Sequence, residues 1–335
     1  MKRTGLHPLW AVVLVLLPVL IGLAALCIGR ISYPLPDIWN VLAARLTGAE
    51  ADKQLTIVIC NIRLPRVLLA MLVGAGLSVA GCAFQSLFAN PLATPDTLGV
   101  ASGTSFGAAL ALLMGMGLLG VQGIAFAFGI LAVVLTWLTS AGNGKGLGSV
   151  VLGGIMIGSL FSSLVSLVKF TADTETQLPA ITYWLMGSLS GAGYEPLKWG
   201  SPWIIGGILV LFLLRWQLNI LPLGEDEARS LGTNLTALRA VTVICATAVT
   251  ASSVAMCGQV GWVGLLIPHI CRMAFGNDHR VLIPASISLG AAFLVIVDTI
   301  ARSVSAAEIP ISVLTAIIGA PFFIVLMRRS GGWRI

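Results

Sequence analysis

The sequence predicts an all-α, polytopic membrane protein with about ten transmembrane helices. Of its 335 residues, 57% are apolar and only 10% are charged, whereas soluble domains carry about 25% charged residues. Apolar blocks of about 20 residues, the length that crosses a hydrocarbon core of roughly 30 Å as a helix, recur along the whole chain. The polar stretches between these blocks are too short for a soluble domain, so residues 1–335 are expected to form a single membrane domain.

The first apolar run, Leu9 to Ile28, follows Lys2 and Arg3, a pattern that is also found in signal peptides. Its length favours a full span, and Leu26 stands where lipid attachment to Cys27 would need a small residue. After this first span, the other nine are expected at 67–88, 97–114, 118–138, 147–168, 200–216, 238–257, 260–275, 281–301 and 311–327. Between the fifth and sixth spans, Leu178 to Ser190 is apolar but too short to cross, which predicts a half-helix at the outer mouth.

The charge pattern predicts which side of the membrane each loop occupies. With ten spans both termini lie on one side, and 11 of the 19 Lys and Arg residues fall on that side. Because cytoplasmic loops carry an excess of positive charge, the termini are expected in the cytoplasm. The net charge of +6 comes from single residues at the edges of spans, which favours membrane topology over nucleic-acid binding.

Cofactor and metal sites are not expected in this chain. The six cysteines are scattered without a C-x-x-C spacing, so neither a metal site nor a disulfide framework is indicated. His269 and His279 lie ten residues apart without a carboxylate or cysteine cluster, which leaves metal binding the weaker alternative. Lys145 in the glycine-rich segment 142–146 is followed by Gly instead of Ser or Thr, so a phosphate-binding loop is not predicted.

Three arginines are expected on the outer face, against the usual charge bias. Arg63 and Arg66 begin the second span, and Arg302 ends the ninth. Arginine binds carboxylates with two parallel hydrogen bonds, so these residues suit an acidic partner protein. The alternatives are that they reach lipid headgroups or that Arg302 pairs with Asp298, one helical turn earlier. The residues alone leave these possibilities open.

Two loops on the inner side contain further candidate residues. The segment 221–234 is the longest charged insertion there and predicts a short helix between Gly224 and Gly232, either a docking helix for a cytosolic partner or a solvated connector. The segment 90–99 contains two prolines that break the helix, and Asp96 or Thr97 is expected to cap the next span. It is either a tight loop or a constriction of a pore, because broken backbone at membrane depth lines a cavity or is buried.

Five motifs together resemble the FecCD family of ABC importer permeases: RLPR at 63–66, NPLATPDTLG at 90–99, LIPHICR with GNDHR at 266–280, VDTIAR at 297–302 and AEIPISVLTAIIGAP at 307–321. The resemblance covers nearly the whole chain in order. It implies the type II importer fold, with a homodimer or a pair with a close paralogue. It also implies two cytosolic ATPase subunits that bind ATP and Mg²⁺, and a periplasmic or lipid-anchored binding protein.

The resemblance also implies roles for individual residues. Arg63, Arg66 and Arg302 match residues that receive acidic side chains of the binding protein, and Asn90 and Leu92 match a cytoplasmic gate. The segment that docks on the ATPase corresponds to Leu221, Gly224, Glu225, Glu227, Ala228, Arg229, Leu231 and Gly232. A wide pathway for a large chelate is expected to be lined by small and hydroxyl side chains such as Ser102, Thr104 and Ser105.

The expected function is therefore transport and not catalysis. The chain is expected in the bacterial inner (plasma) membrane, where it would carry an iron chelate, either a ferric siderophore or haem, or cobalamin, with ATP hydrolysis in its partners. An ion-coupled secondary transporter is the main rival, but it needs coupling carboxylates or broken helices near the middle of the membrane in matching halves. A structural scaffold would not require the outer arginines or the charged inner helix.

Overall fold

The computed structural model is a bundle of helices, and it describes residues 8–48, 52–140, 147–223, 225–305 and 307–329. Within these ranges no residue belongs to a strand. Lipid offers the backbone no hydrogen-bond partner, so each span must satisfy its own N–H and C=O groups as a helix. Seven of the described helices are long and apolar enough to cross a membrane, and three shorter apolar helices accompany them. The prediction of an all-α protein with about ten spans is confirmed.

The helices follow the expected order along the chain. The seven long spans are α1 (Pro8–Cys27), the continuous run α3 (Lys53–Thr56), η1 (Ile57–Arg63) and α4 (Leu64–Leu87), then α6 (Leu118–Ser140), α7 (Leu147–Thr171), α9 (Tyr194–Leu213), α11 (Leu235–Cys257) and α13 (His279–Val304). The shorter apolar helices are α5 (Val100–Leu113), α12 (Val263–Phe275) and α14 (Ile311–Arg329). The remaining elements are α2 (Leu35–Thr47), α8 (Gln177–Leu185), α10 (Glu225–Ser230) and the 3₁₀ turns η2 (Pro95–Leu98) and η3 (Gln217–Asn219). Helix α8 is the short helix expected between the fifth and sixth spans.

The second span differs most from its predicted bounds of 67–88, because helix begins at Lys53 and continues for 35 residues. Asp52 caps it by accepting hydrogen bonds from the backbone N–H groups of Gln54 (2.8 Å) and Leu55 (3.2 Å). A wider π-helical stretch, η1, ends just before Pro65 enters the helix. Proline has no N–H and crowds the preceding turn, which a wider turn accommodates. At about 1.5 Å per residue the run is roughly 52 Å long, so one end projects beyond the hydrocarbon.

Three other spans begin later or earlier than predicted, for local reasons. Helix α5 begins at Val100 instead of 97, because η2 forms a separate turn that ends at Gly99 with φ +74°. Helix α12 begins at Val263 instead of 260, since the backbone from Gly258 to Trp262 is irregular and Trp262 has φ +69°. Helix α9 begins at Tyr194 instead of 200, and its first turns contain the polar pair Glu195 and Lys198.

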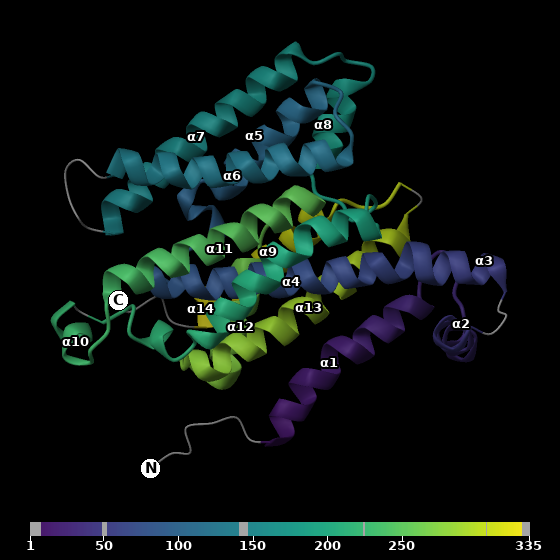
Figure 1. Ribbon diagram of the computed structural model, residues 1–335, viewed down its shortest axis with the longest axis horizontal. Helices are drawn as coiled ribbons and strands as arrows, with labels where there is room; N and C mark the ends of the chain where they lie inside the picture. The colour runs from purple at the N-terminus through teal and green to yellow at the C-terminus, as the bar shows by residue number, and fades with distance from the viewer. Residues whose placement is uncertain (1–7, 49–51, 141–146, 224, 306, 330–335) are drawn as a thin grey trace.

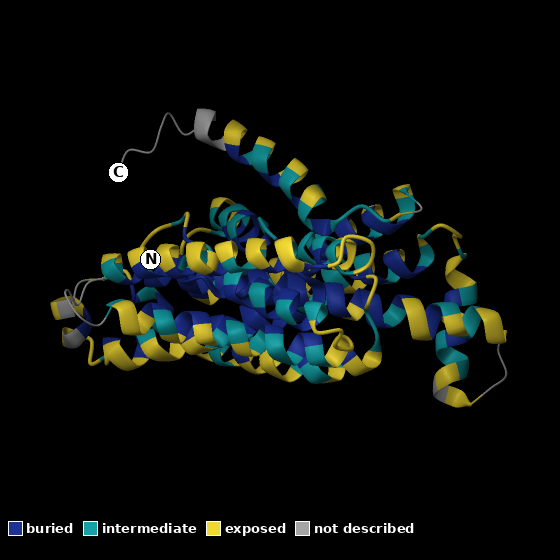
Figure 2. Ribbon diagram, turned by 90° about the horizontal axis from the view of Figure 1, so that it is seen from above, coloured by how far each residue is buried: buried dark blue, intermediate teal, exposed yellow. Residues whose placement is uncertain are grey.

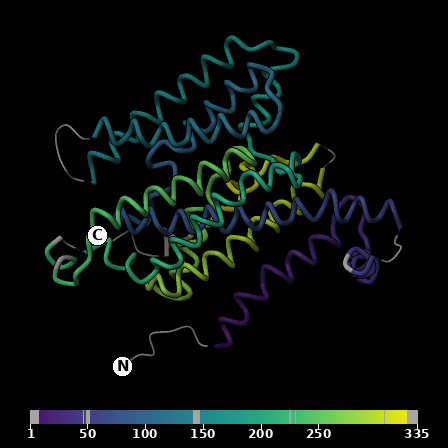
Figure 3. Tube along the Cα trace, viewed as in Figure 1, coloured from purple at the N-terminus to yellow at the C-terminus, as the bar shows by residue number. Residues whose placement is uncertain are grey.

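Helix α4 lies at the centre of the molecule, with α9 and α11 between it and the layer formed by α5, α6, α7 and α8, and with α12, α13 and α1 on its other side (Figure 1). In the apolar stretch of the run from α3 to α4, 83% of residues are buried, against 22% for α1 and 22% for α7. Figure 3 shows that α5 to α8 are consecutive in the chain, whereas the early helix α4 is surrounded by the late helices α11 to α13. The last helix, α14, leans away from the bundle and is exposed along one side (Figure 2). We call the end with α2 and α3 the α2 end, and the opposite end, with α10, the α10 end.

Glycines allow α4 to touch its neighbours backbone to backbone. A Cβ atom placed on Gly81 would lie 1.9 Å from the carbonyl oxygen of Gly264 in α12, and one on Gly74 would lie 2.2 Å from that of Gly290 in α13. Small residues at helix contacts are the usual means of close approach in lipid, where no hydrophobic force drives helices together. These contacts fix the position of α12 and α13, which contribute polar residues to both ends of the bundle.

We expect Gly81→Ala to lower thermal stability in detergent by several degrees, because the methyl group has no space and overpacking typically costs about 1–3 kcal/mol. The matched control is Gly123→Ala in α6, where no atom lies within 4 Å of the added Cβ. There alanine should be neutral or slightly stabilising, by about 0.4–1 kcal/mol through helix propensity and the unfolded state. Equal melting temperatures for the two variants would contradict the assigned packing.

Candidate functional site

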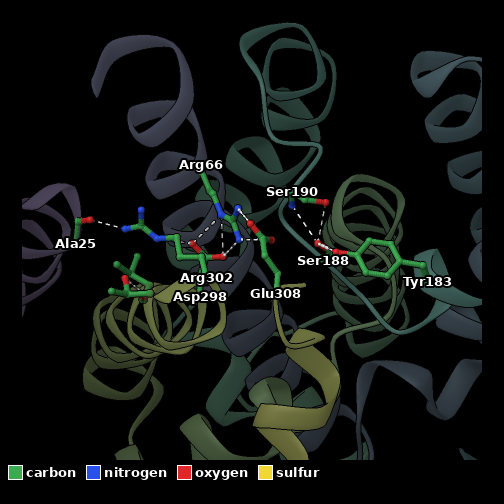
Figure 4. Close-up of polar contacts among 10 residues, drawn as sticks. Ala25, Arg66, Tyr183, Ser188, Ser190, Asp298, Arg302 and Glu308 are labelled. Atoms are coloured by element: carbon green, nitrogen blue, oxygen red, sulfur yellow. Dashed lines mark hydrogen bonds and ion pairs between the residues drawn. The ribbon is translucent and has the colours of Figure 1, made fainter. Parts of the chain in front are cut away.

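The first candidate site is an ionic cluster at the α2 end, centred on Arg66 of α4. Its guanidinium contacts Asp298 of α13 through Nε and Nη2, with N···O distances of 2.8–3.1 Å. On the other side it donates to both carboxylate oxygens of Glu308, in the turn between α13 and α14, at 2.9 and 3.0 Å. Figure 4 shows the planar fork held between the two carboxylates. This geometry suits arginine alone, because lysine lacks the planar fork.

Arg63 and Arg302 bind the carboxyl-terminal end of α1. Arg63 donates to the carbonyls of Leu26 and Ile31 and lies 5.0 Å from the ring centroid of Tyr33. Arg302 donates to the carbonyl of Ala25 and stands 3.7 Å from Asp298. Helix α1 has no basic residue in its own last turn, and these two arginines satisfy its terminal carbonyls and oppose the negative end of its dipole.

All three arginines predicted at the outer face are therefore together, but they are buried. Arg63 is 6% exposed, and Arg66 and Arg302 are each 8% exposed. Of the alternatives left open by the sequence, pairing with Asp298 is observed, although Arg66 is the closer partner and Arg302 the looser one. The partner that the sequence analysis missed is Glu308, whose side chain is 24% exposed and whose backbone has φ +48°. In the sequence, Glu308 was visible only as a single acidic residue shortly before Pro310.

Removing Arg66 by substitution with alanine should destabilise the protein by about 3 kcal/mol or more, because Asp298 would remain buried with only the looser contact of Arg302 to offset its charge. The matched control is Lys198→Ala, which breaks an exposed pair with Glu195 whose side chains are 72% and 71% exposed. Such pairs contribute about 0–1 kcal/mol. The double variant Arg66→Ala with Asp298→Ala should recover part of the loss. Thermal melting in detergent measures all three, and a loss no larger than that of the control would refute the buried pairing.

The segment 90–99, predicted to break the helix between the second and third spans, lies at the α10 end in the loop 88–99 that follows α4. Asn90 accepts a hydrogen bond from the backbone N–H of Leu92 (2.9 Å), and the Leu92 side chain is 51% exposed. Asp96 accepts from the backbone N–H of Ser102 (3.3 Å) in the first turn of α5, but the N-cap of this helix is Gly99, so neither Asp96 nor Thr97 takes the expected N-cap position. Asp96 also faces a pocket of 440 Å³ whose lining includes Thr94, Gln259 and Trp262.

The segment 221–234 forms the predicted short helix, α10. Leu221 and Ala228 are 2% and 0% exposed and fasten the segment to the bundle, whereas Leu231 is 54% exposed. Gly232 adopts φ +70°, and Asn234 caps α11 by accepting from the N–H of Ala237 (3.0 Å). Glu227 is exposed. Gly224 lies outside the described residues, as do the side chains of Glu225 and Arg229.

The remaining candidates lie in different surroundings. Thr104 is fully buried where α5 meets Gly129 of α6 and Ser105 is 5% exposed, so in the single chain only Ser102 keeps appreciable open surface. The His269 ring packs beside Phe323, with ring centroids 5.5 Å apart, while His279 is buried at the start of α13. Among the described residues no three His, Cys, Asp or Glu side chains gather as a metal site would require.

Comparison with known proteins gives a consistent result. The model of the FecCD transport family matches residues 15–329. The chain belongs to this family. It is 42% identical to the molybdate import permease of Haemophilus influenzae, over 95% of this chain and 96% of that one. It is 38% identical to the vitamin B12 import permease of Klebsiella pneumoniae, over 96% and 94%.

A solved structure agrees with these sequence matches. A transporter assigned to the metal-chelate type of ABC transporter, in an inward-facing conformation, is 40% identical and superposes with a TM-score of 0.88 over 96% of this chain and 100% of that one. The FecCD chain described here is thus a multi-pass permease subunit of an ABC importer with the type II fold. The resemblance inferred from the five motifs is confirmed.

Proposed function

We propose that this FecCD permease imports a metal chelate, such as a ferric siderophore or haem, or cobalamin. Two cytosolic ATPase subunits would supply the energy by hydrolysing ATP with Mg²⁺, and a periplasmic or lipid-anchored binding protein would deliver the cargo. The observation that carries the proposal is the match over nearly the full length to the FecCD family and to a transporter of the metal-chelate type. Family members named as permeases for different metal-containing cargoes lie within a few per cent of one another in identity to this chain.

The orientation we propose places the α10 end in the cytoplasm. The segment 221–234 exposes Asp226 and Glu227 in α10 and Leu231 directly after it, which is the kind of small amphipathic surface that docks into a groove of a partner. The bias of positive residues toward this side supports the same orientation. The binding protein would then contact the α2 end.

Assembly with a second copy, or with a close paralogue, is part of the proposal. Helices α7 and α14 expose large apolar side chains along much of their length, among them Ile155, Leu160 and Ile317. In a type II importer two permeases enclose one pathway, and exposed helices at the edge of the single chain provide surface for that contact. The exposed apolar surface that a second permease does not cover would face lipid.

The α2 end offers a polar surface to a binding protein. Beside Glu308 and Arg66, the exposed hydroxyls of Tyr183, Ser188 and Ser190 form a hydrogen-bonded group, with distances of 3.2 Å and 3.0 Å (Figure 4). In the docking role, Arg63, Arg66 and Arg302 would receive carboxylates of the binding protein. Glu308 occupies half of the Arg66 fork, so an incoming carboxylate competes with it.

That competition predicts that Glu308→Gln strengthens binding of the binding protein by about three- to tenfold, because one negative charge that repels its carboxylates is removed. The matched control is Glu195→Gln, an exposed carboxylate in the first turn of α9. Binding would be measured on the permease in nanodiscs by surface plasmon resonance. Unchanged or weaker binding for Glu308→Gln would contradict docking at Arg66. Charge reversal at Arg63 and Arg66 is a poorer test, because new carboxylates would face Asp298 and the carbonyls of α1.

Molybdate is the second candidate cargo, favoured by the 42% identity to a molybdate permease. We place a chelate first because the chain superposes over 96% of its length on a transporter of the metal-chelate type.

Uptake by proteoliposomes that contain the permease, its ATPase and its binding protein should distinguish the cargoes. With ATP inside, we expect accumulation of a ferric siderophore, haem or cobalamin, and at least about tenfold less molybdate. ATP should be required, and a sodium or proton gradient should not replace it. Accumulation of molybdate alone would reverse the choice of cargo, and uptake on an ion gradient without ATPase would refute the importer proposal.

A further inference from the structure

A chain of buried and half-buried polar side chains crosses the α10 end between the segment 221–234 and the loop 88–99. It begins at Asn219, the last residue of η3. The Asn219 Oδ1 atom accepts hydrogen bonds from the backbone N–H of His279 (3.0 Å) and from its ring Nδ1 (2.8 Å). The other ring nitrogen, Nε2, is hydrogen bonded to the hydroxyl of Ser86 in the last turn of α4. His279 is 6% exposed and Ser86 is 4% exposed.

The partners fix the direction of these hydrogen bonds. The backbone N–H of His279 can only donate, so the Asn219 atom that faces it must be the oxygen. The same oxygen requires Nδ1–H to donate, which leaves Nε2 of the neutral imidazole as the acceptor for the Ser86 hydroxyl. The Asn219 amide nitrogen then donates to Asp278 Oδ1 (3.0 Å). The hydrogen-bonding groups of Ser86, His279 and Asn219 therefore all have partners only while the three side chains keep these contacts.

At one end this chain is attached to the segment 221–234. Asn219 directly precedes Ile220 and Leu221, which are 3% and 2% exposed and are packed into the bundle. The backbone continues through a turn in which the N–H of Leu223 donates to the carbonyl of Ile220 (3.0 Å). A displacement of the segment therefore moves Asn219 with it.

At the other end the chain is attached to the loop 88–99. The Ser86 carbonyl accepts from the N–H of Ala89 (3.2 Å), and the neighbouring Gln85 carbonyl accepts from the N–H of Asn90 (3.0 Å). The Gln85 side chain also accepts from Arg272 and donates to the carbonyl of Gly264 (3.2 Å), both in α12. Ala89 has φ +46°. The start of the loop thus takes its position from Gln85 and Ser86.

We propose that Asn219, His279 and Ser86 form a coupling relay, which carries the movement of the segment 221–234 to the loop that contains Asn90 and Leu92. The inference rests on the proposed function, in which that segment docks on the ATPase and that loop forms the gate. Apolar side chains slide past one another at little cost, but buried hydrogen bonds resist separation because each lost partner leaves an unsatisfied polar group away from water. The relay residues act by positioning the gate and touch no cargo.

Capping of α13 alone does not explain why Ser86, His279 and Asn219 lie together. The start of α13 is already capped by Asp278, which accepts from the N–H of Arg280 (3.0 Å). The Arg280 side chain also hydrogen bonds this carboxylate and lowers the pKa of Asp278 to about 2, so the cap is ionised at neutral pH. Asn219 also satisfies the backbone N–H of His279, the first residue of α13, but Ser86, which comes from α4, contributes nothing to this cap.

The test uses the permease assembled with its ATPase in nanodiscs, with Leu92→Cys as a reporter of the gate. Its labelling rate by a water-soluble maleimide is compared with and without ATP plus vanadate. Native cysteines supply a background that is measured on the protein without the reporter. Asn219→Ala and Ser86→Ala remove the relay at its two ends. Ser288→Ala is the matched control, because Ser288 is also a buried serine but donates to the carbonyl of Leu14 in α1.

We expect the nucleotide-dependent change in labelling to fall by about threefold or more in Asn219→Ala and Ser86→Ala. ATP hydrolysis should persist in both, and Ser288→Ala should respond as the parent does. Ser86→Thr, which restores the hydroxyl, should recover the response. A parallel melting curve shows whether each variant is folded.

Any other result contradicts either the proposed gate and its coupling to the ATPase or the relay itself. If the parent itself shows no nucleotide-dependent labelling, the proposed gate or its ATPase coupling is wrong, and the relay fails with it. If nucleotide changes the labelling of the parent and changes that of both relay variants by the same amount, the relay is overturned while the proposed gate stands. Loss of the response in Ser288→Ala as well, or lack of recovery in Ser86→Thr, would assign the effect to general packing and overturn the relay.

Discussion

The close contact of α4 with α12 and α13 is the constraint on which the rest of this permease depends. Gly81 and Gly74 let the backbones meet without intervening side chains, and no other residue fits where a Cβ would lie 1.9 Å from a carbonyl oxygen. The same central helix carries both polar clusters, with Arg66 near one end and Ser86 near the other. Twenty residues of helix separate them, or about 30 Å, which equals the hydrocarbon thickness. The glycines therefore hold apolar helices together between two polar clusters at the two membrane surfaces.

The two clusters deal with charge in different ways. At the α2 end, three guanidiniums lie against two carboxylates and the terminal carbonyls of α1, so every charge has a partner within the chain. Buried ion pairs of this kind contribute little net stability, but breaking one is costly, so they select one arrangement of helices. At the α10 end the central contacts are neutral, and Ser86, His279 and Asn219 form a directed chain of hydrogen bonds. The first arrangement favours rigidity, whereas the second joins elements that have to move together.

This division agrees with the demands of an importer that obtains both its energy and its cargo from partners. The docking surface that we propose must keep its shape while a binding protein arrives, and a network of paired, buried arginines suits that demand. Glu308 is the most accessible member of that network, and its side chain is 24% exposed. The opposite end must transmit movement over a short distance, and Asn219 and Ser86 lie where the segment 221–234 and the loop 88–99 leave the bundle.

The sequence by itself determined the properties that depend on local composition. Lipid requires each span to be apolar and helical, so the number of spans, the short helices α8 and α10 and the breaks at the prolines of the loop 88–99 followed from residue order alone. The family motifs added the class of transporter. The contact of Asp96 with the first turn of α5 was within reach of the sequence because the two are neighbours in the chain.

Only the tertiary structure decided which side chains meet. Arg66 is separated from Asp298 by 232 residues and from Glu308 by 242, and Ser86 lies 193 residues from His279. In lipid the residues that face other helices are as apolar as those that face the membrane, so hydrophobic periodicity does not identify the contact faces. The helical extension back to Lys53 was missed because its first turn is polar and because Arg63 and Pro65 separate the mostly apolar residues 57–62 from the span that follows. The Asp52 cap and the burial of Ile59 stabilise this extension. Interhelical pairing depends on shape and on polar partners far away in the chain, and these are fixed only when the helices pack.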